Sequence, residues 1–225
     1  LIEGTHLVEE ALKSGQNVRH LVATPDYDLS QLPNQAHSLP LLLVSPELLK
    51  DLSETPTPQG IMAVIDLPSS PLGWQPSGQR YLILDAVQDP GNLGTLIRTA
   101  DAAAYDGVIL GKGTVDVYND KVLRASQGSL WHLEVVSLDL LQEARPAFEA
   151  AGIPWFVTAL HQEAKAYQEV PANQKLALVL GNEGQGVSEA VIQAADQTIY
   201  IPMPGQAESL NVAVAGGILM FYFQA

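Results

Sequence analysis

Residues 81–100 read YLILDAVQDPGNLGTLIRTA, in which an apolar run, a polar loop and a helical pattern follow one another directly. Pro90-Gly91 predicts a turn, and Asn92 is a suitable N-cap for a helix over Leu93–Ala104. The residues of this helix that we expect to face the core are Ile97, Ala100 and Ala104. Arg98 lies less than two helical turns after Asn92, close to the polar loop; the alternative is a solvated surface arginine. A strand, a loop and a helix in this order are typical of a parallel α/β sheet.

The same alternation continues to the end of the chain. Further strands are expected at Gly107–Leu110, Pro154–Thr158, Leu176–Leu180 and Thr198–Ile201, and further helices near Leu138–Ala151, Ser188–Ala195 and Leu210–Phe223. This alternation predicts an α/β fold with a mainly parallel sheet covered on both faces. The functional site of such a sheet is expected beyond the carboxyl ends of its strands.

The composition changes at residues 67–79, LPSSPLGWQPSGQ, which contain three Pro, two Gly and three Ser and no charged residue. This composition is typical of a linker, and the alternative is an ordered surface loop within one domain. We therefore expect a domain over residues 1–66, a linker over 67–79 and a second domain over 80–225.

The first 66 residues predict a small α/β/α domain without a visible catalytic constellation. A helix is expected over Thr5–Lys13, and Ser45 followed by Pro46 predicts the start of a second helix that ends near Leu52. Buried strands are expected at Leu21–Ala23 and Leu41–Val44, and a further strand at Gly60–Ile65.

The composition also excludes several classes of protein. The 225 residues carry 11 Lys and Arg against 25 Asp and Glu, a net charge of −14, and 47% are hydrophobic, so the chain can form packed cores. The absence of Cys excludes disulfides and thiolate sites and agrees with a cytoplasmic location. No apolar stretch reaches the length of about 18 residues that a membrane-spanning helix needs, and residues 1–4 lack the features of a signal peptide. Taken alone, the acidity argues against a nucleic-acid partner.

A second polar loop, residues 180–189, reads LGNEGQGVSE and follows an expected strand. Its three glycines allow a ligand to approach the backbone closely. Their spacing differs from the Gly-x-Gly-x-x-Gly of dinucleotide-binding proteins, and no Gly-Lys-Ser/Thr follows, so neither that fingerprint nor a phosphate-binding loop is present. Glu183 within the loop favours a functional over a purely structural role.

A third polar loop, residues 201–211, reads IPMPGQAESLN and leads into an apolar helix. Ser209 is the expected cap of that helix, and capping alone does not account for Asn211. Small residues in the helix permit close packing in the core or across a dimer; they are Ala213, Ala215, Gly216 and Gly217.

Together the three loops resemble the motifs of the SPOUT superfamily of methyltransferases, specifically the tRNA/rRNA ribose 2′-O-methyltransferases of the TrmH type. The matching motifs are Asn92-x-Gly94-x-x-x-Arg98-Thr99-Ala100, Gly181-Asn182-Glu183-Gly184-Gln185-Gly186-Val187-Ser188, and Ile201-Pro202-Met203 with Ser209-Leu210-Asn211-Val212. The first domain resembles the ribosomal-protein-L30e-like substrate-binding domain that precedes such catalytic domains. That likeness rests on Ile2-Glu3-Gly4, the helix after it and Gly60–Val64.

The resemblance implies S-adenosylmethionine as the cofactor, held in a cleft made by a deep C-terminal trefoil knot. It also implies a homodimer that completes the cleft at the subunit interface. In such proteins backbone groups hold the adenosine, and the matching positions are Thr158, Ala159, Gly181, Ile201, Met203 and Leu210. No metal is implied, and the five histidines are scattered without the spacing of metal ligands.

The implied reaction is attack of a ribose 2′-hydroxyl on the sulfonium methyl group of the cofactor. Arg98 matches the arginine that is proposed as the base in this family. Because the pKa of a guanidinium exceeds about 12, orienting the RNA phosphate and ribose is an equally economical role. The other catalytic positions implied are Asn92, Glu183, Ser209 and Asn211, with Glu183 holding Arg98 or the ribose.

The predicted function is therefore 2′-O-methylation of RNA, with 23S ribosomal RNA favoured over tRNA because of the additional N-terminal domain. The alternatives are a tRNA methyltransferase and a non-catalytic RNA-binding protein with a vestigial site. Candidate contacts to RNA phosphates are Arg98, Lys112, Lys121 and Arg124, whose alternative role is ordinary solubilising charge. These cations fall within 27 residues of an acidic chain, which predicts salt-sensitive RNA binding.

Overall fold

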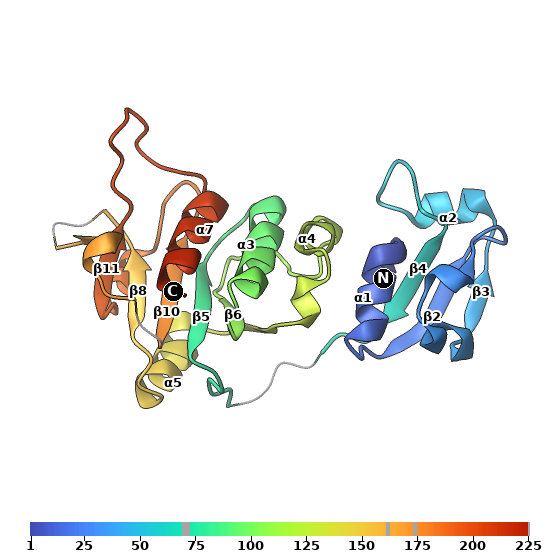
Figure 1. Cartoon of the computed structure of the whole chain (residues 1–225), viewed down its shortest axis with the longest axis horizontal. Coiled ribbons are helices and arrows are strands. Elements are labelled where there is room, and N and C mark those ends of the chain that lie inside the picture. Colours follow the sequence, from blue (N-terminus) through green and yellow to red (C-terminus); the bar gives the residue numbers. More distant parts are fainter. Residues whose placement is uncertain (69–72, 161–162, 173–174, 225) are drawn as a thin grey trace. The chain divides into compact units, whose positions relative to one another are not determined.

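The computed structural model describes residues 1–68, 73–160, 163–172 and 175–224. The chain forms two compact units, Leu1–Ser69 and Ser70–Ala225, and each is described by itself (Figure 1). None of the helices within the described residues is long and apolar enough to span a membrane.

The unit Leu1–Ser69 is a four-stranded sheet with two α-helices. The strands are β1 (Ile2–Glu3), β2 (Val18–Ala23), β3 (Leu41–Leu43) and β4 (Ile61–Ile65), in the order β1-β4-β2-β3. Helix α1 (Thr5–Lys13) buries one apolar face, made of Leu7, Val8, Ala11 and Leu12. Helix α2 (Pro46–Leu52) starts as predicted, because the hydroxyl of Ser45 accepts a hydrogen bond from the Leu48 amide at 3.3 Å. Two 3₁₀ turns, Leu29–Gln31 and Asn34–Ser38, connect β2 to β3.

Leu41–Leu43 form a strand as predicted, but the prediction that this strand is buried is wrong. Strand β3 lies at the edge of the sheet and pairs in parallel with β2. Its three leucine side chains are exposed, up to 63% for Leu43. An apolar run of this length predicts a strand but does not distinguish a central strand from an edge strand.

The unit Ser70–Ala225 is built on a seven-stranded sheet in which every described pairing is parallel. The strand order is β7-β6-β5-β10-β8-β11-β9. The strands are β5 (Arg80–Asp85), β6 (Gly107–Leu110), β7 (Glu134–Ser137), β8 (Trp155–Thr158), β9 (Lys165–Ala166), β10 (Leu176–Gly181) and β11 (Gln197–Tyr200). The predicted parallel sheet is confirmed, and the short strands β7 and β9 were not predicted. Strands β6 and β7 follow β5 on one side of it, and all later strands lie on its other side. Strand β10 is the neighbour of β5 on that side, so the strand order reverses between β5 and β10.

Helices cover both faces of this sheet. Helices α3 (Pro90–Ala102) and α7 (Val212–Phe223) lie on one face, and α3 packs between α7 and α4 (Asp120–Ser126) (Figure 1). Helices α5 (Arg145–Ala150), preceded by a π turn at Leu140–Ala144, and α6 (Glu189–Gln193) contribute to the core on the other face. Gly94 is needed at the contact of α3 with α4, because an added Cβ would lie 2.4 Å from the Cβ of Ala125.

Two of the predicted helix caps are wrong. Helix α3 is capped by Asp89, whose carboxylate accepts a hydrogen bond from the Asn92 amide at 2.7 Å, and Pro90 occupies its first turn. Helix α7 is capped by Asn211, not by Ser209. In both cases the cap leaves other side chains of the loop free to serve different roles. Ala104 does not face the core, since α3 ends before it and Ala104 adopts a φ of 53°.

The core on the α5 face contains an aromatic cluster. Tyr81 and Phe148 pack edge to face with centroids 5.1 Å apart, and Trp74 and Trp155 adjoin Phe148. Trp74 belongs to the predicted linker, but it is 7% exposed and its Nε1 donates to Glu134 at 2.7 Å. Residues 73–79 of that stretch are thus part of this unit, while residues 69–72 lie outside the described residues.

Candidate active site

Three polar loops converge at the carboxyl ends of the central strands, as expected for a parallel sheet. The loop after β10 contacts the loop after β5 through Asn182, whose Nδ2 donates to the carbonyl of Ala86 at 2.8 Å. The loop before α7 joins them through Asn211. A cavity of about 600 Å³ opens between the loops that follow β8, β10 and β11. All six positions assigned to the cofactor line this cavity, namely Thr158, Ala159, Gly181, Ile201, Met203 and Leu210.

A chain of side-chain hydrogen bonds connects all three motifs. Asn211 donates through Nδ2 to Oδ1 of Asn92 at 2.9 Å, and Asn92 donates through Nδ2 to Oε1 of Glu183 at 3.1 Å. At one end, Oδ1 of Asn211 accepts from the amides of Ala213 and Val214 in the first turn of α7. The orientation of Asn92 is thereby set by both the helix cap and the carboxylate.

Glu183 holds the first loop rather than an arginine. Its two carboxylate oxygens accept hydrogen bonds from the backbone amides of Gln88 at 3.2 Å and Asp89 at 3.0 Å. Partial burial raises the pKa of Glu183, but the hydrogen bonds from Asn92 and the backbone amides outweigh it, so the pKa lies below its ordinary value. Glu183 is therefore ionised at neutral pH, and the predicted contact with Arg98 is not what the structure shows.

Asn182 in the second motif is a positioning residue, a role that the sequence pattern does not indicate. Its Oδ1 accepts from the amides of Gly184 and Gln185 at 2.9 and 3.1 Å, which folds the glycine-rich loop back on itself. Gly181 before it admits no side chain, because an added Cβ would lie 2.1 Å from the amide nitrogen of Val187. The alternation of glycine and polar residues was the available signal for this tight loop.

The remaining predicted catalytic residues lie at different places around the site. Ser209 lines the cavity together with Glu183 and Asn211. Asn92 and Arg98 do not belong to the described lining; both are on α3, where Arg98 is exposed. Within the described part of the chain, no ion pair is formed by Arg98, so its guanidinium is available to a ligand.

The predicted phosphate contacts differ in their availability. Lys112 follows β6, at the same edge of the sheet as the cavity, and its side chain is exposed. Lys121 is exposed on α4, whereas Arg124 on the same helix pairs with Asp120 at 2.6 Å. A partly exposed ion pair within one helix is weak, so a phosphate can compete for Arg124.

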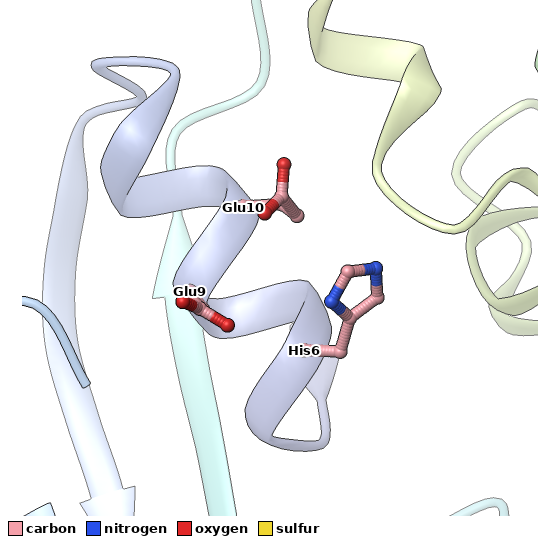
Figure 2. A group of neighbouring side chains, drawn as sticks. All are labelled: His6, Glu9 and Glu10. Atoms are coloured by element: carbon pink, nitrogen blue, oxygen red, sulfur yellow. The ribbon is translucent and has the colours of Figure 1, made fainter. Parts of the chain in front are cut away.

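The described residues contain one group of side chains that could approach a metal ion, on α1 of the first unit. The possible ligand atoms of His6, Glu9 and Glu10 lie within 4.8 Å of one another (Figure 2). Both carboxylates already face Lys13, whose Nζ lies 2.7 Å from Glu9 and 3.4 Å from Glu10. The group is thus a partly neutralised surface cluster of the first unit.

Comparison with known proteins gives a family match for each unit. Residues 79–221 match the SpoU rRNA Methylase family, and residues 1–71 match the family described as RNA 2′-O ribose methyltransferase substrate binding. The chain belongs to the SpoU rRNA methylase family. A relative in Bacillus subtilis, the 23S rRNA (guanosine(2553)-2′-O)-methyltransferase RlmP, is 44% identical over 225 residues, which cover 100% of this chain and 88% of the relative.

Solved structures of RNA methyltransferases share the fold. A putative RNA methyltransferase of the TrmH family from Porphyromonas gingivalis has a TM-score of 0.86 and 34% identity, covering 99% of this chain and 88% of that one. The AdoMet-bound rRNA methyltransferase from Sinorhizobium meliloti has a TM-score of 0.85 and 30% identity, covering 99% and 85%. The predicted methyltransferase family, its α/β fold and its cofactor, S-adenosylmethionine, are thereby confirmed.

The cavity of this SpoU methylase fits S-adenosylmethionine in size and chemistry. Apolar side chains, including Ile201, Met203 and Leu210, offer contacts to an adenine ring. Carboxylates also line the cavity, at Glu183, Glu189 and Glu208. Negative charge is favourable beside a ligand that carries a sulfonium and an ammonium group.

Proposed function

We propose that the chain transfers a methyl group from S-adenosylmethionine to a ribose 2′-hydroxyl of 23S ribosomal RNA. The observation that supports this most is the convergence of the three motif loops at one edge of the sheet. The cavity lies between the second and third of them, and a single hydrogen-bonded chain of Glu183, Asn92 and Asn211 ties the first motif to both. The 44% identity to a 23S rRNA 2′-O-methyltransferase over the whole chain favours ribosomal RNA. A structure that connects all three motifs argues against a vestigial site.

The side chains of the site have distinct roles in this proposal. The bound cofactor supplies an electrophilic methyl group. Arg98, exposed and free of an ion pair among the described residues, holds the RNA phosphate and orients the ribose hydroxyl for in-line attack. Glu183 stays ionised and fixes the loop over residues 88–89, which places the start of α3 and therefore Arg98. Ser209 lines the cavity and is positioned to contact the substrate ribose or the cofactor.

We also propose a homodimer formed through α7. Its residues Val214, Ile218 and Phe221 recur at the spacing of one helical face and are 52%, 37% and 48% exposed. An exposed apolar stripe of this kind marks an interaction surface. Because α3 packs beside α7, this dimer brings Arg98 close to the subunit interface. The trefoil knot and the cytoplasmic location remain predictions.

The proposal is tested by incubating the protein with S-adenosylmethionine labelled in its methyl group and either 23S ribosomal RNA or total tRNA. We expect label in the ribosomal RNA and background label in the tRNA. Label in tRNA alone would support the tRNA alternative, and no label in either RNA would support a non-catalytic role.

A further inference from the structure

A second cavity, of about 880 Å³, lies within the unit Leu1–Ser69. It is bounded by the first turns of α1, the segment after β2 and the segment before β4. The residues of its lining that matter here are Glu9, Thr24, Asp26, Tyr27, Asp28 and Lys50. Neither the proposed chemistry nor the cofactor uses this cavity.

The charge around this cavity is unfavourable for a phosphate. Three carboxylates face one lysine in its lining. The two other basic residues of the unit, Lys13 and Arg19, are held by carboxylates: Lys13 at 2.7 Å from Glu9, and Arg19 at 2.8 Å from Asp66. The acidic lining of this cavity therefore favours contact with RNA groups other than the phosphates.

The wall of the cavity offers hydrogen bonds and an aromatic ring. The side chain of Thr24 is 6% exposed, and its hydroxyl reaches the carbonyl of Gly60 only at 3.5 Å, so it retains capacity for a ligand. The hydroxyl of Tyr27 lies 3.0 Å from Oγ1 of Thr5, which fixes the half-buried ring. Gly60 has a φ of +82°, and an added Cβ would lie 2.9 Å from the Thr24 hydroxyl, so a glycine keeps this wall open.

We propose that this cavity binds an unstacked nucleobase of the RNA substrate, with guanine as the best match. Proteins read single-stranded RNA by stacking unpaired bases on aromatic rings and bonding their edges. Carboxylates only accept hydrogen bonds, and guanine presents adjacent N–H donors at N1 and N2 that one carboxylate can accept together. Asp26 lines the cavity and can accept from such an edge, and Tyr27 in the same lining offers its ring; Glu9 on α1 also lines the cavity but is paired with Lys13 (Figure 2 shows Glu9 on α1). This inference rests on the proposed function, because it requires an RNA substrate.

The test compares the affinities of the full chain and of its variants for short RNAs. Binding is measured by fluorescence anisotropy. The probes are an oligouridylate, the same oligonucleotide with one central guanosine, and the same with inosine, which lacks the 2-amino group. The variant is Asp26→Asn, and Glu54→Gln is the matched control, because Glu54 is exposed on the same unit but outside the cavity lining. Both changes remove one negative charge.

A general effect of charge and a direct contact of Asp26 with a base predict opposite changes in the affinity of Asp26→Asn for the guanosine probe. Loss of a negative charge alone tightens binding to every oligonucleotide. If Asp26 reads a base, Asp26→Asn weakens binding of the guanosine probe by about tenfold, as expected for a lost hydrogen bond to a charged group. The same variant leaves binding of the oligouridylate equal or tighter, inosine shows an intermediate affinity, and Glu54→Gln affects all probes alike.

A parent protein without preference for guanosine, or an Asp26→Asn variant that tightens all probes equally, would overturn the base-binding proposal. Methyl transfer to 23S ribosomal RNA, measured on the same preparations, tests the proposed function separately. Activity without guanosine preference refutes only the role of this cavity.

Discussion

At the scale of single residues, Asn92 is the member of the site whose two partners come from different motifs. It donates to Glu183 and accepts from Asn211. We expect Asn92→Ala to lower the single-turnover rate of methyl transfer by about tenfold or more, since two hydrogen bonds are lost and one involves a charged group. Its melting temperature should stay close to the parent value, because Asn92 is not the cap of α3. A loss of stability that accounts for the loss of rate would contradict this role, and Asn34→Ala, an exposed substitution in the other unit, is the control.

The carboxylate of Glu183 makes stability depend on pH in a defined direction. Its pKa in the folded chain lies below the ordinary value of 4.5. The folded state therefore stabilises the ionised carboxylate more than the unfolded state does. The resulting stabilisation is present at neutral pH, begins to fall below about pH 4.5, and is lost once the pH drops below the folded pKa. We expect Glu183→Gln to lower the melting temperature at neutral pH, and the difference from the parent to shrink on acidification. A difference that is constant with pH would contradict this assignment.

The residues of the site could be predicted from the sequence more readily than their roles. Asp89-Pro90 carries the same signal as Ser45-Pro46, a capping residue before a proline in the first helical turn, yet Asn92 was assigned the cap of α3. Glu183 contacts the amides of Gln88 and Asp89, which lie 95 and 94 residues before it in the sequence. A local sequence pattern cannot predict a contact between residues so far apart in the chain.

At the scale of the elements, the approach of α3 to α4 determines where the first motif lies. An added Cβ at Gly94 would lie 2.4 Å from the Cβ of Ala125 and 2.7 Å from the carbonyl of Val122. Replacing glycine by alanine within a helix favours folding by about 1 kcal/mol through propensity alone. We expect Gly94→Ala instead to destabilise the chain by about 1–3 kcal/mol, because the contact is overpacked.

Denaturant unfolding checks this expectation. Gly205→Ala serves as the control, since an added Cβ at Gly205 meets no atom within 4 Å. A Gly94→Ala variant as stable as the parent would show that α3 and α4 can separate without cost.

Local patterns predicted the elements well where a strand or helix has a continuous apolar face. Strand β6 has the bounds expected from the sequence, and α1 buries the face that its periodicity indicated. The short α4 and the strands β7 and β9 were not predicted, because each has too few residues to show a periodic pattern of apolar side chains. The burial of β3 could not be predicted, since it depends on the position of the strand within the sheet.

At the scale of the whole molecule, the apolar stripe of α7 predicts a dimer. We expect the parent to run as a dimer in size-exclusion chromatography with light scattering, and Phe221→Glu to shift it to a monomer, because a charge is then placed in an apolar contact. Leu48→Glu is the matched control, with a side chain 48% exposed like that of Phe221. A monomeric parent, or a Phe221→Glu variant that stays dimeric, would contradict the use of this face.

The net charge of −14 does not by itself exclude RNA binding. The carboxylates are distributed over both units, whereas exposed cations near the sheet edge include Arg98 and Lys112. RNA affinity should therefore be modest and should fall with added salt, as for any binding that neutralises phosphates. The composition alone could not show this distribution.

The central claim is that the cavity and Arg98 together methylate a ribose hydroxyl, and the position of the transferred group tests it most directly. 23S ribosomal RNA would be treated with the protein and S-adenosylmethionine carrying a deuterated methyl group, digested to nucleosides and analysed by mass spectrometry. We predict the label on the ribose of one kind of nucleoside, and none with Arg98→Ala. Label on a base, or undiminished ribose label with Arg98→Ala, would contradict the account.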